Sequence, residues 1–174
     1  MEKIKIFAGI YRSMVNKNYE KELRSGGGSM FEKILVPVDG SETSWRAMSE
    51  AQELANAFHG ELVVVNVIQP YNNSAMLVVP LDQATISQGN AELTKIGNSV
   101  LETAKEKLES FKGKKSFDLE VGHPSERVLA ICKEKQCTAI VIGSRGLSGI
   151  AEFFLGSVSS KVSQYADVPV LIVK

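Results

Sequence analysis

The chain has 174 residues, of which 44% are hydrophobic and 23% charged, a composition typical of one globular domain rather than a disordered or fibrous chain. Twenty Lys and Arg residues balance twenty Asp and Glu residues, so no excess of positive charge favours nucleic acid as a partner. Two cysteines cannot build a disulfide framework, and no apolar run approaches the roughly 20 residues needed to cross a bilayer. We therefore expect a cytoplasmic protein without membrane contact.

Residues 1–29 differ in charge from the rest of the chain. They carry six Lys and Arg against three Asp and Glu, whereas residues 30–174 carry 14 against 17. The segment ends in a flexible linker, Arg24–Ser29, and a second methionine follows. We predict that residues 1–29 are an appended leader and linker, and that residues 30–174 form the domain. The alternative is a native strand at Lys3–Ala8 and a helix at Tyr11–Leu23 that pack on a neighbour.

The first half of the domain reads as strand, helix, strand. Ile34–Val38 is a short apolar run that predicts a strand. Ser41 is a suitable N-cap for a helix whose apolar stripe extends from Trp45 to Phe58. Gly60 is expected to end this helix, and the β-branched run Leu62–Ile68 predicts a strand buried on both faces.

The middle of the chain continues the alternation. Residues 70–88 show no clear period, so we predict a variable loop there. A second helical stripe extends from Ala91 to Phe111, and a short strand is expected at Ser116–Val121. After Gly122-His123-Pro124-Ser125, a helix carries apolar residues up to Cys132.

The last segment adds two strands and a helix. Thr138–Ile142 and Val168–Val173 read as strands, separated by a glycine-rich loop over residues 143–150 and a helix at Gly156–Ala166. Five apolar strands alternating with helices predict an α/β fold with one parallel sheet covered on both faces. Ligands bind such sheets at the carboxyl ends of the strands, where the winding reverses. We therefore expect a site between the first and fourth strands.

The glycines after the fourth strand suit a phosphate-binding loop. Two residues separate Gly143 from Gly146, and nine more separate Gly146 from Gly156 at a helix start. Bare amides at a helix start bind anions, and the hydroxyls of Ser157 and Ser159 could donate to phosphate oxygens. The pattern lacks the Gly-Lys-Ser/Thr of a P-loop. The alternative is a loop whose glycines only turn the chain and cap a helix.

Together, these motifs resemble the universal stress protein family. Gly-x-x-Gly, nine residues and Gly-Ser is that family's nucleotide-binding pattern. Lys33–Ser41 is similar to its opening strand, Gly122–Pro124 to its Gly-x-Pro, and Val168–Val173 to its closing strand. The resemblance covers residues 30–174. It implies a Rossmann-like five-stranded parallel sheet of order 3-2-1-4-5 and a homodimer that holds ATP.

The resemblance also implies a binding site for ATP, with AMP or ADP as alternatives. Residues at strand ends would line the adenine and ribose pocket: Pro37, Val38, Asp39, Val67, Ile142 and Gly143. Residues of the glycine loop and the following helix start would surround the phosphates: Ser144, Arg145, Gly146, Gly156, Ser157, Val158 and Ser159. Asp39 could take part in Mg²⁺ coordination through water, its alternative role being to cap the following turn.

We therefore expect an ATP-binding universal stress protein with a nucleotide-dependent regulatory or stress-response role. One alternative is a protein-interaction module on the same fold that ignores nucleotides. Another is a hydrolase or transferase, which would need a general base that the sequence does not position. We assign no catalytic residue and predict at most a slow ATPase.

The remaining features have simpler interpretations. Cys132 and Cys137 fit neither a Cys-x-x-Cys pair nor a zinc pattern, and five residues along a helix would put them on different faces. We predict that both are core or boundary residues. Val168–Val173 is expected at a sheet edge, where an apolar strand associates unless it is paired. Antiparallel pairing with a second copy would satisfy it, so we predict a homodimer through this strand.

Overall fold

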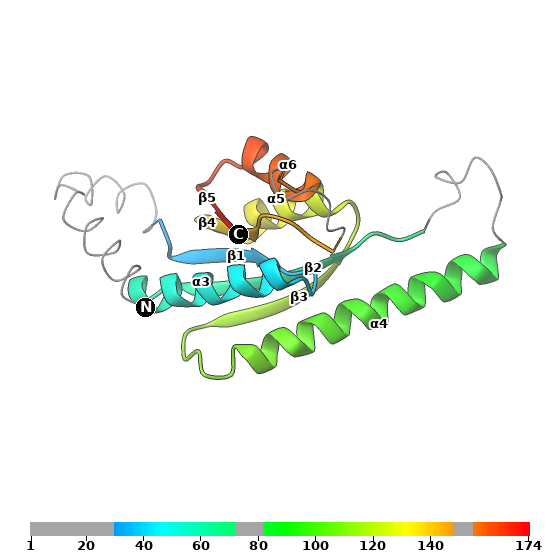
Figure 1. The fold of residues 1–174 in the computed structure, drawn as a ribbon, viewed down its shortest axis with the longest axis horizontal. Coiled ribbons are helices and arrows are strands. Elements are labelled where there is room, and N and C mark those ends of the chain that lie inside the picture. Colours follow the sequence, from blue (N-terminus) through cyan, green and yellow to red (C-terminus); the bar gives the residue numbers. More distant parts are fainter. Residues whose placement is uncertain (1–29, 72–81, 148–154) are drawn as a thin grey trace.

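The computed structural model describes residues 30–71, 82–147 and 155–174. Within these ranges, strands and helices alternate along the chain (Figure 1). Both predictions for residues 1–29, the appended leader and the native strand and helix, lie outside the described residues. So do residues 72–81 of the predicted loop over 70–88 and residues 148–150 of the predicted glycine-rich loop over 143–150.

The strands form one parallel sheet in the order β3-β2-β1-β4-β5. The strands are β1 (Lys33–Pro37), β2 (Glu61–Ile68), β3 (Lys115–Val121), β4 (Ala139–Gly143) and β5 (Val170–Val173). At the centre, Leu35 of β1 lies opposite Val63 of β2 and Ile140 of β4. The predicted fold class and strand order are confirmed, with strand bounds within two residues of those expected.

Helices cover both faces of this sheet (Figure 1). Helices α3 (Glu42–Phe58) and α4 (Gln83–Lys107) lie on one face, and α5 (Pro124–Glu134) and α6 (Ser157–Tyr165) on the other. Successive β1 side chains serve opposite faces, since Val36 packs in the cluster under α3 and α4 while Leu35 packs under α5 and α6. Both side chains are fully buried, as expected for a parallel sheet between two helical layers.

Helix α4 begins earlier than its apolar stripe indicates. The predicted loop over residues 70–88 is wrong from Gln83 onward, because Asp82 caps the helix. The Asp82 carboxylate accepts hydrogen bonds from the Thr85 N–H at 2.8 Å and its Oγ1 at 2.9 Å. The first turns of α4 are largely exposed, so they carry no apolar period by which to find them. At its other end, the Lys115 ammonium donates to the carbonyls of Leu108 and Phe111, and the helix stops at Lys107.

Helix α3 ends at Phe58, two residues before the glycine that was expected to end it. His59 takes the left-handed conformation, with φ of 57°, and the Gly60 N–H donates to the Ala55 carbonyl at 2.9 Å. This is the helix-ending motif in which the chain reverses through a left-handed residue. Gly60 serves a different purpose, because a β carbon there would lie 2.0 Å from the carbonyl oxygen of Phe31. The absence of a side chain at Gly60 thus allows the Phe31 backbone to pack closely and is not what ends the helix.

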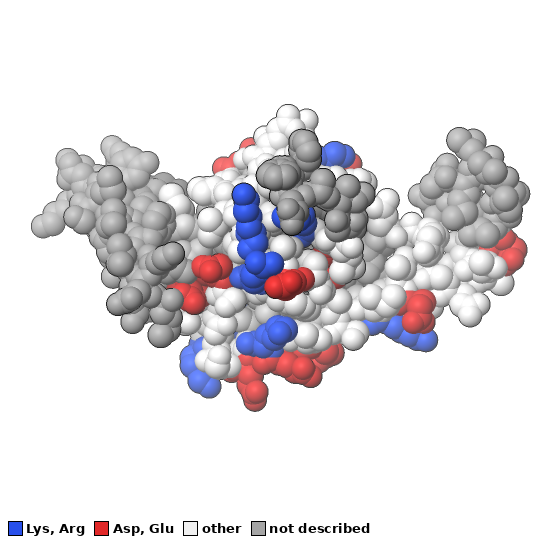
Figure 2. Space-filling view, in the orientation of Figure 1, with Lys and Arg blue, Asp and Glu red and all other residues white. Residues whose placement is uncertain are grey.

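The surface carries both signs of charge. Figure 2 shows Lys and Arg side chains interspersed with Asp and Glu on one face of the molecule. Several are paired, as in the Lys114–Glu61 contact at 2.9 Å. Among the described helices, none combines the length and apolar character that spanning a bilayer requires.

The central strands should dominate stability. Ile140→Ala, at a fully buried position of β4, should lower the free energy of unfolding by about 2–5 kcal/mol. Ile96→Ala makes the same change on α4, where the side chain is 53% exposed, and should shift it by less than about 0.5 kcal/mol. Urea unfolding monitored by circular dichroism measures both values, and equal losses would contradict the assigned core.

Candidate functional site

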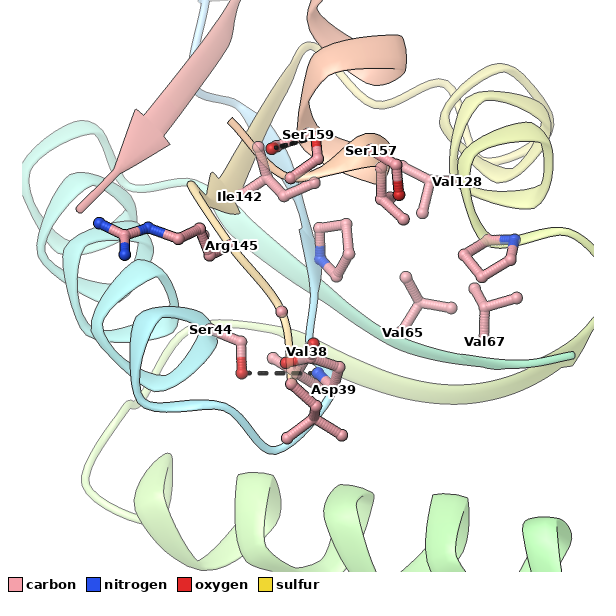
Figure 3. A pocket seen from close by; sticks show the side chains of 17 residues that line it. Val38, Asp39, Ser44, Val65, Val67, Val128, Ile142, Arg145, Ser157 and Ser159 are labelled. Carbon is pink, nitrogen blue, oxygen red and sulfur yellow. Dashed lines mark hydrogen bonds between the residues drawn. The ribbon is translucent and has the colours of Figure 1, made fainter. Parts of the chain in front are cut away.

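A pocket of about 320 Å³ lies at the carboxyl ends of β1 and β4 (Figure 3). The chain leaves β1 toward α3 on one face of the sheet and leaves β4 toward α6 on the other. The two chain segments diverge there, as expected at a switch point. Seventeen residues line the pocket: Pro37, Val38, Asp39, Ser44, Val65, Val67, Pro124, Val128, Ile142, Gly143, Arg145, Gly146, Leu147, Gly156, Ser157, Val158 and Ser159.

One end of the pocket is apolar. Val65 and Val67 project from β2, and Val128 faces them from α5 (Figure 3). Pro124, the first residue of α5, also lines the pocket. Val65 and Val67 share a face because side chains along a strand alternate. Ile142, from β4, completes this wall. Aliphatic side chains on several sides suit a flat, weakly polar ring.

The start of α6 supplies the polar end. Gly156 is the N-cap, without a side-chain cap, and the first turn holds no acidic residue. The first intrahelical bond runs from the Ser160 N–H to the Gly156 carbonyl. The amides of Ser157, Val158 and Ser159 therefore have no acceptor among the described residues, as is usual in a first helical turn. These three residues line the pocket, so a partial positive charge lies at its wall.

Two serines connect the glycine loop to its neighbours. The Ser144 N–H donates to the Val173 carbonyl of β5 at 2.6 Å. The Ser144 carbonyl accepts from the Gly156 N–H at 2.8 Å and from Oγ of Ser159 at 2.9 Å. Ser144 is the one predicted site residue that does not line the pocket, and its side chain is 2% exposed. Both serines hold α6 against the end of β4, and the Ser159 hydroxyl is engaged in that contact.

Asp39 lies at the tip of β1 with its two carboxylate oxygens in different surroundings. Oδ1 accepts from the Ser41 N–H at 3.0 Å and from its hydroxyl at 2.6 Å, which is the capping role given above as an alternative. Oδ2 faces the glycine loop, since a β carbon added to Gly146 would lie 2.5 Å from it. Gly146 therefore leaves room for the carboxylate beside the pocket.

The first turn of α3 lies against the glycine loop. A β carbon on Gly143 would lie 2.8 Å from the carbonyl carbon of Thr43, so only glycine allows this approach. The Thr43 hydroxyl donates to the Arg145 carbonyl. The Arg145 backbone thus borders the pocket, while Figure 3 shows its guanidinium extending away from Val65 and Val67.

The structure adds lining residues that sequence reasoning missed. Ser44, Val65, Pro124, Val128 and Leu147 line the pocket beside twelve of the thirteen predicted residues. The sequence could have predicted Val65, because it lies two residues before the predicted Val67 on the same strand and so shares its face. The motif that contains Pro124 was recognised, but only the fold brings α5 over the ends of β1 and β2.

Known proteins share both sequence and fold with this chain. The model of the universal stress protein family matches residues 30–174. The chain belongs to this family. It is 40% identical over 149 residues to universal stress protein YxiE of Bacillus subtilis, a match that covers 83% of this chain and 100% of that protein.

Solved universal stress protein structures superpose on this one. MJ0577 from Methanocaldococcus jannaschii has a TM-score of 0.71 at 27% identity, covering 84% of this chain and 97% of that one. A universal stress protein solved in complex with cAMP has a TM-score of 0.62 at 24% identity, covering 84% and 99%. The latter similarity concerns the fold alone.

The contact between α3 and the glycine loop should be measurable. Thr43→Val keeps the shape of the side chain but removes its bond to the Arg145 carbonyl, and should lower the free energy of unfolding by about 0.5–1.5 kcal/mol. It should also speed amide exchange at residues 145–147. Thr94→Val is the control, since that hydroxyl bonds only within exposed α4, to Asn90. If the two variants changed the free energy of unfolding and the amide exchange rates equally, the contact between Thr43 and Arg145 would be contradicted.

Proposed function

We propose that this universal stress protein binds ATP, with Mg²⁺, in the pocket between β1 and β4, and that occupancy regulates a stress response. One observation carries the proposal. The start of α6, whose first turn holds no acidic residue, lies at the wall of a pocket whose far end is apolar. This pairing matches a ligand with an anionic end and an aromatic end. Free adenine nucleotides have both.

The apolar end suits adenine. Val65 and Val67 from the sheet and Val128 from α5 surround space that a flat base could fill (Figure 3). Burying an aromatic ring there would remove apolar surface from water on both partners, at roughly 25 cal/mol per Å². The universal stress protein in complex with cAMP has this fold, so the architecture can hold an adenine nucleotide.

The polar end suits phosphates. Amides of Ser157 and Val158 would donate to phosphate oxygens, and the Ser157 hydroxyl, which points into the pocket in Figure 3, would add a bond. A β carbon at Gly146 would meet the Asp39 carboxylate beside the pocket, and one at Gly156 would lie 3.4 Å from the α carbon of Arg145, so both glycines let these segments pack closely at the site. Arg145 adds positive charge to the same loop.

The residues present also suit a hydrated Mg²⁺ ion. Oδ2 of Asp39 faces Gly146 at the pocket, and a carboxylate there would accept hydrogen bonds from water in the ion's shell. When bound, the ion would neutralise phosphate charge. Among the described lining residues, Asp39 is the only carboxylate, and Ser41 already engages its Oδ1. We therefore propose that the protein regulates by binding the nucleotide, with at most slow hydrolysis. We place this function in the cytoplasm, where ATP is abundant and thiols stay reduced.

Isothermal titration of the full chain with Mg·ATP tests the proposal. We expect saturable binding to the wild type, and none to Gly146→Val at millimolar nucleotide, because the added side chain meets Asp39 and narrows the pocket. Circular dichroism should show that the variant remains folded. Absence of binding by the wild type would refute the proposal.

A finer pair of variants tests the phosphate end. Ser157→Ala should weaken Mg·ATP binding about tenfold or more, the loss expected for one hydrogen bond to a charged group. Ser160→Ala makes the same change three residues along α6, at an exposed position that does not line the pocket, and should bind like the wild type. Equal affinities for the two variants would place the phosphates elsewhere.

We also propose that the protein is a homodimer paired through β5. This strand lies at a sheet edge with Leu171 42% exposed. Leu171→Lys should therefore yield monomers by size exclusion with light scattering. Val121→Lys places the same charge on β3, at the opposite edge, where the side chain is 58% exposed, and should leave the dimer intact. A monomeric wild type would contradict this proposal without affecting the nucleotide site.

A further inference from the structure

The two cysteines meet at the C-terminal end of α5. The helix ends at Glu134, and Gln136 takes a left-handed φ of 54°. The Cys137 N–H then donates to the Cys132 carbonyl at 2.8 Å. This is the same helix-ending motif as in α3, and it brings the residues at these two positions into contact. The expectation that the cysteines lie on different faces of a helix is wrong, because the helix stops between them.

The geometry of this turn suits a disulfide. Both cysteines are free thiols in the cluster under α5 and α6. Sγ of Cys132 lies 3.9 Å from the carbonyl oxygen of Cys137. A backbone bond of 2.8 Å between the two residues holds their α carbons about 5–6 Å apart, within the roughly 4.4–6.8 Å that disulfides span.

A small pocket gives access to the thiols. It has a volume of about 110 Å³, and both cysteines line it. Lys133 and Asp167 also line it and form an ion pair at 2.9 Å, with side chains 70% and 71% exposed, so the rim lies at the surface. One water molecule needs only about 10–15 Å³, so a molecule the size of hydrogen peroxide fits.

The two thiols differ in acidity. A hydrogen bond from the Cys137 thiol lowers the pKa of Cys132, with a smaller contribution from the charge of Lys133, while burial and the charge of Asp167 act in the opposite direction. That hydrogen bond, together with burial, raises the pKa of Cys137. The nucleophile in thiol oxidation is the thiolate, so this difference favours attack by Cys132 and resolution by Cys137.

We propose that Cys132 and Cys137 form a peroxide-reactive dithiol that closes to an intramolecular disulfide. The Cys132 thiol loses its proton, and its sulfur attacks one oxygen of hydrogen peroxide. The O–O bond breaks, a sulfenic acid forms, and the departing hydroxide takes up a proton to leave as water. The Cys137 sulfur then attacks the sulfenic sulfur, the S–S bond forms, and a second water leaves. The dithiol loses two electrons and the peroxide gains them.

The full reduced chain treated with hydrogen peroxide tests the proposal directly. The protein contains two cysteines, so an intramolecular disulfide must join this pair. The thiol count should fall from two to zero per chain, and the intact mass should fall by two hydrogen atoms. The product should migrate as a single chain without reductant and regain both thiols with dithiothreitol. Circular dichroism should show that the protein stays folded throughout.

Two isosteric variants test the assigned roles. Cys137→Ser retains the attacking thiol, so it should stop at a sulfenic acid that dimedone traps in one equivalent per chain. Cys132→Ser retains only the resolving thiol, which should react at least tenfold more slowly. Equal rates in the two variants would overturn the assignment.

Three results with the wild type would overturn the dithiol itself. The first is that both thiols persist in the folded chain and disappear only after denaturation. The second is that oxidation yields interchain disulfides, and the third is that each thiol oxidises independently without loss of two hydrogens. The dithiol lies outside the nucleotide pocket, so none of these results bears on the proposed function.

Discussion

The divergence of the chain beyond β1 and β4 is the constraint on which the site depends. These strands are neighbours in the sheet, yet one continues into α3 below it and the other into α6 above it. The pocket lies between these two departing segments. Side chains from β2 and α5 wall one side, and the first-turn amides of α6, which have no acceptor among the described residues, wall the other. A polar and an apolar wall thus come from elements far apart in the sequence.

The described residues of the glycine loop both border this space and pack against neighbouring elements. Gly143 accepts the backbone of Thr43 at a distance that no β carbon permits, and Ser144 joins the loop to β5 and α6 through its backbone. The described part of the loop is therefore supported from three sides, by α3, β5 and α6. Neighbouring residues of the loop therefore have different roles: Gly143 and Ser144 pack against α3, β5 and α6, whereas Gly146 borders the pocket.

Short-range signals account for where sequence reasoning succeeded and where it failed. The β-branched run of β2 and the apolar stripe of α3 report burial directly, so the fold class could be predicted from their alternation. The first turns of α4 are exposed and polar, and only the cap at Asp82 marks them. His59 and Gln136 end helices in the left-handed conformation, although neither residue type signals a stop as glycine does.

The sequence by itself determined the alternation of elements, the position of the glycine loop after a buried strand, and most residues that border the pocket. The first two follow from local periodicity and chain direction, whereas the residues bordering the pocket were implied by the resemblance to the universal stress protein family. Tertiary structure alone decided that Ser144 supports the loop from outside the pocket, that Val128 closes its apolar end, and that Cys132 meets Cys137. Each depends on where a helix stops or which face it covers, and packing between distant segments sets both.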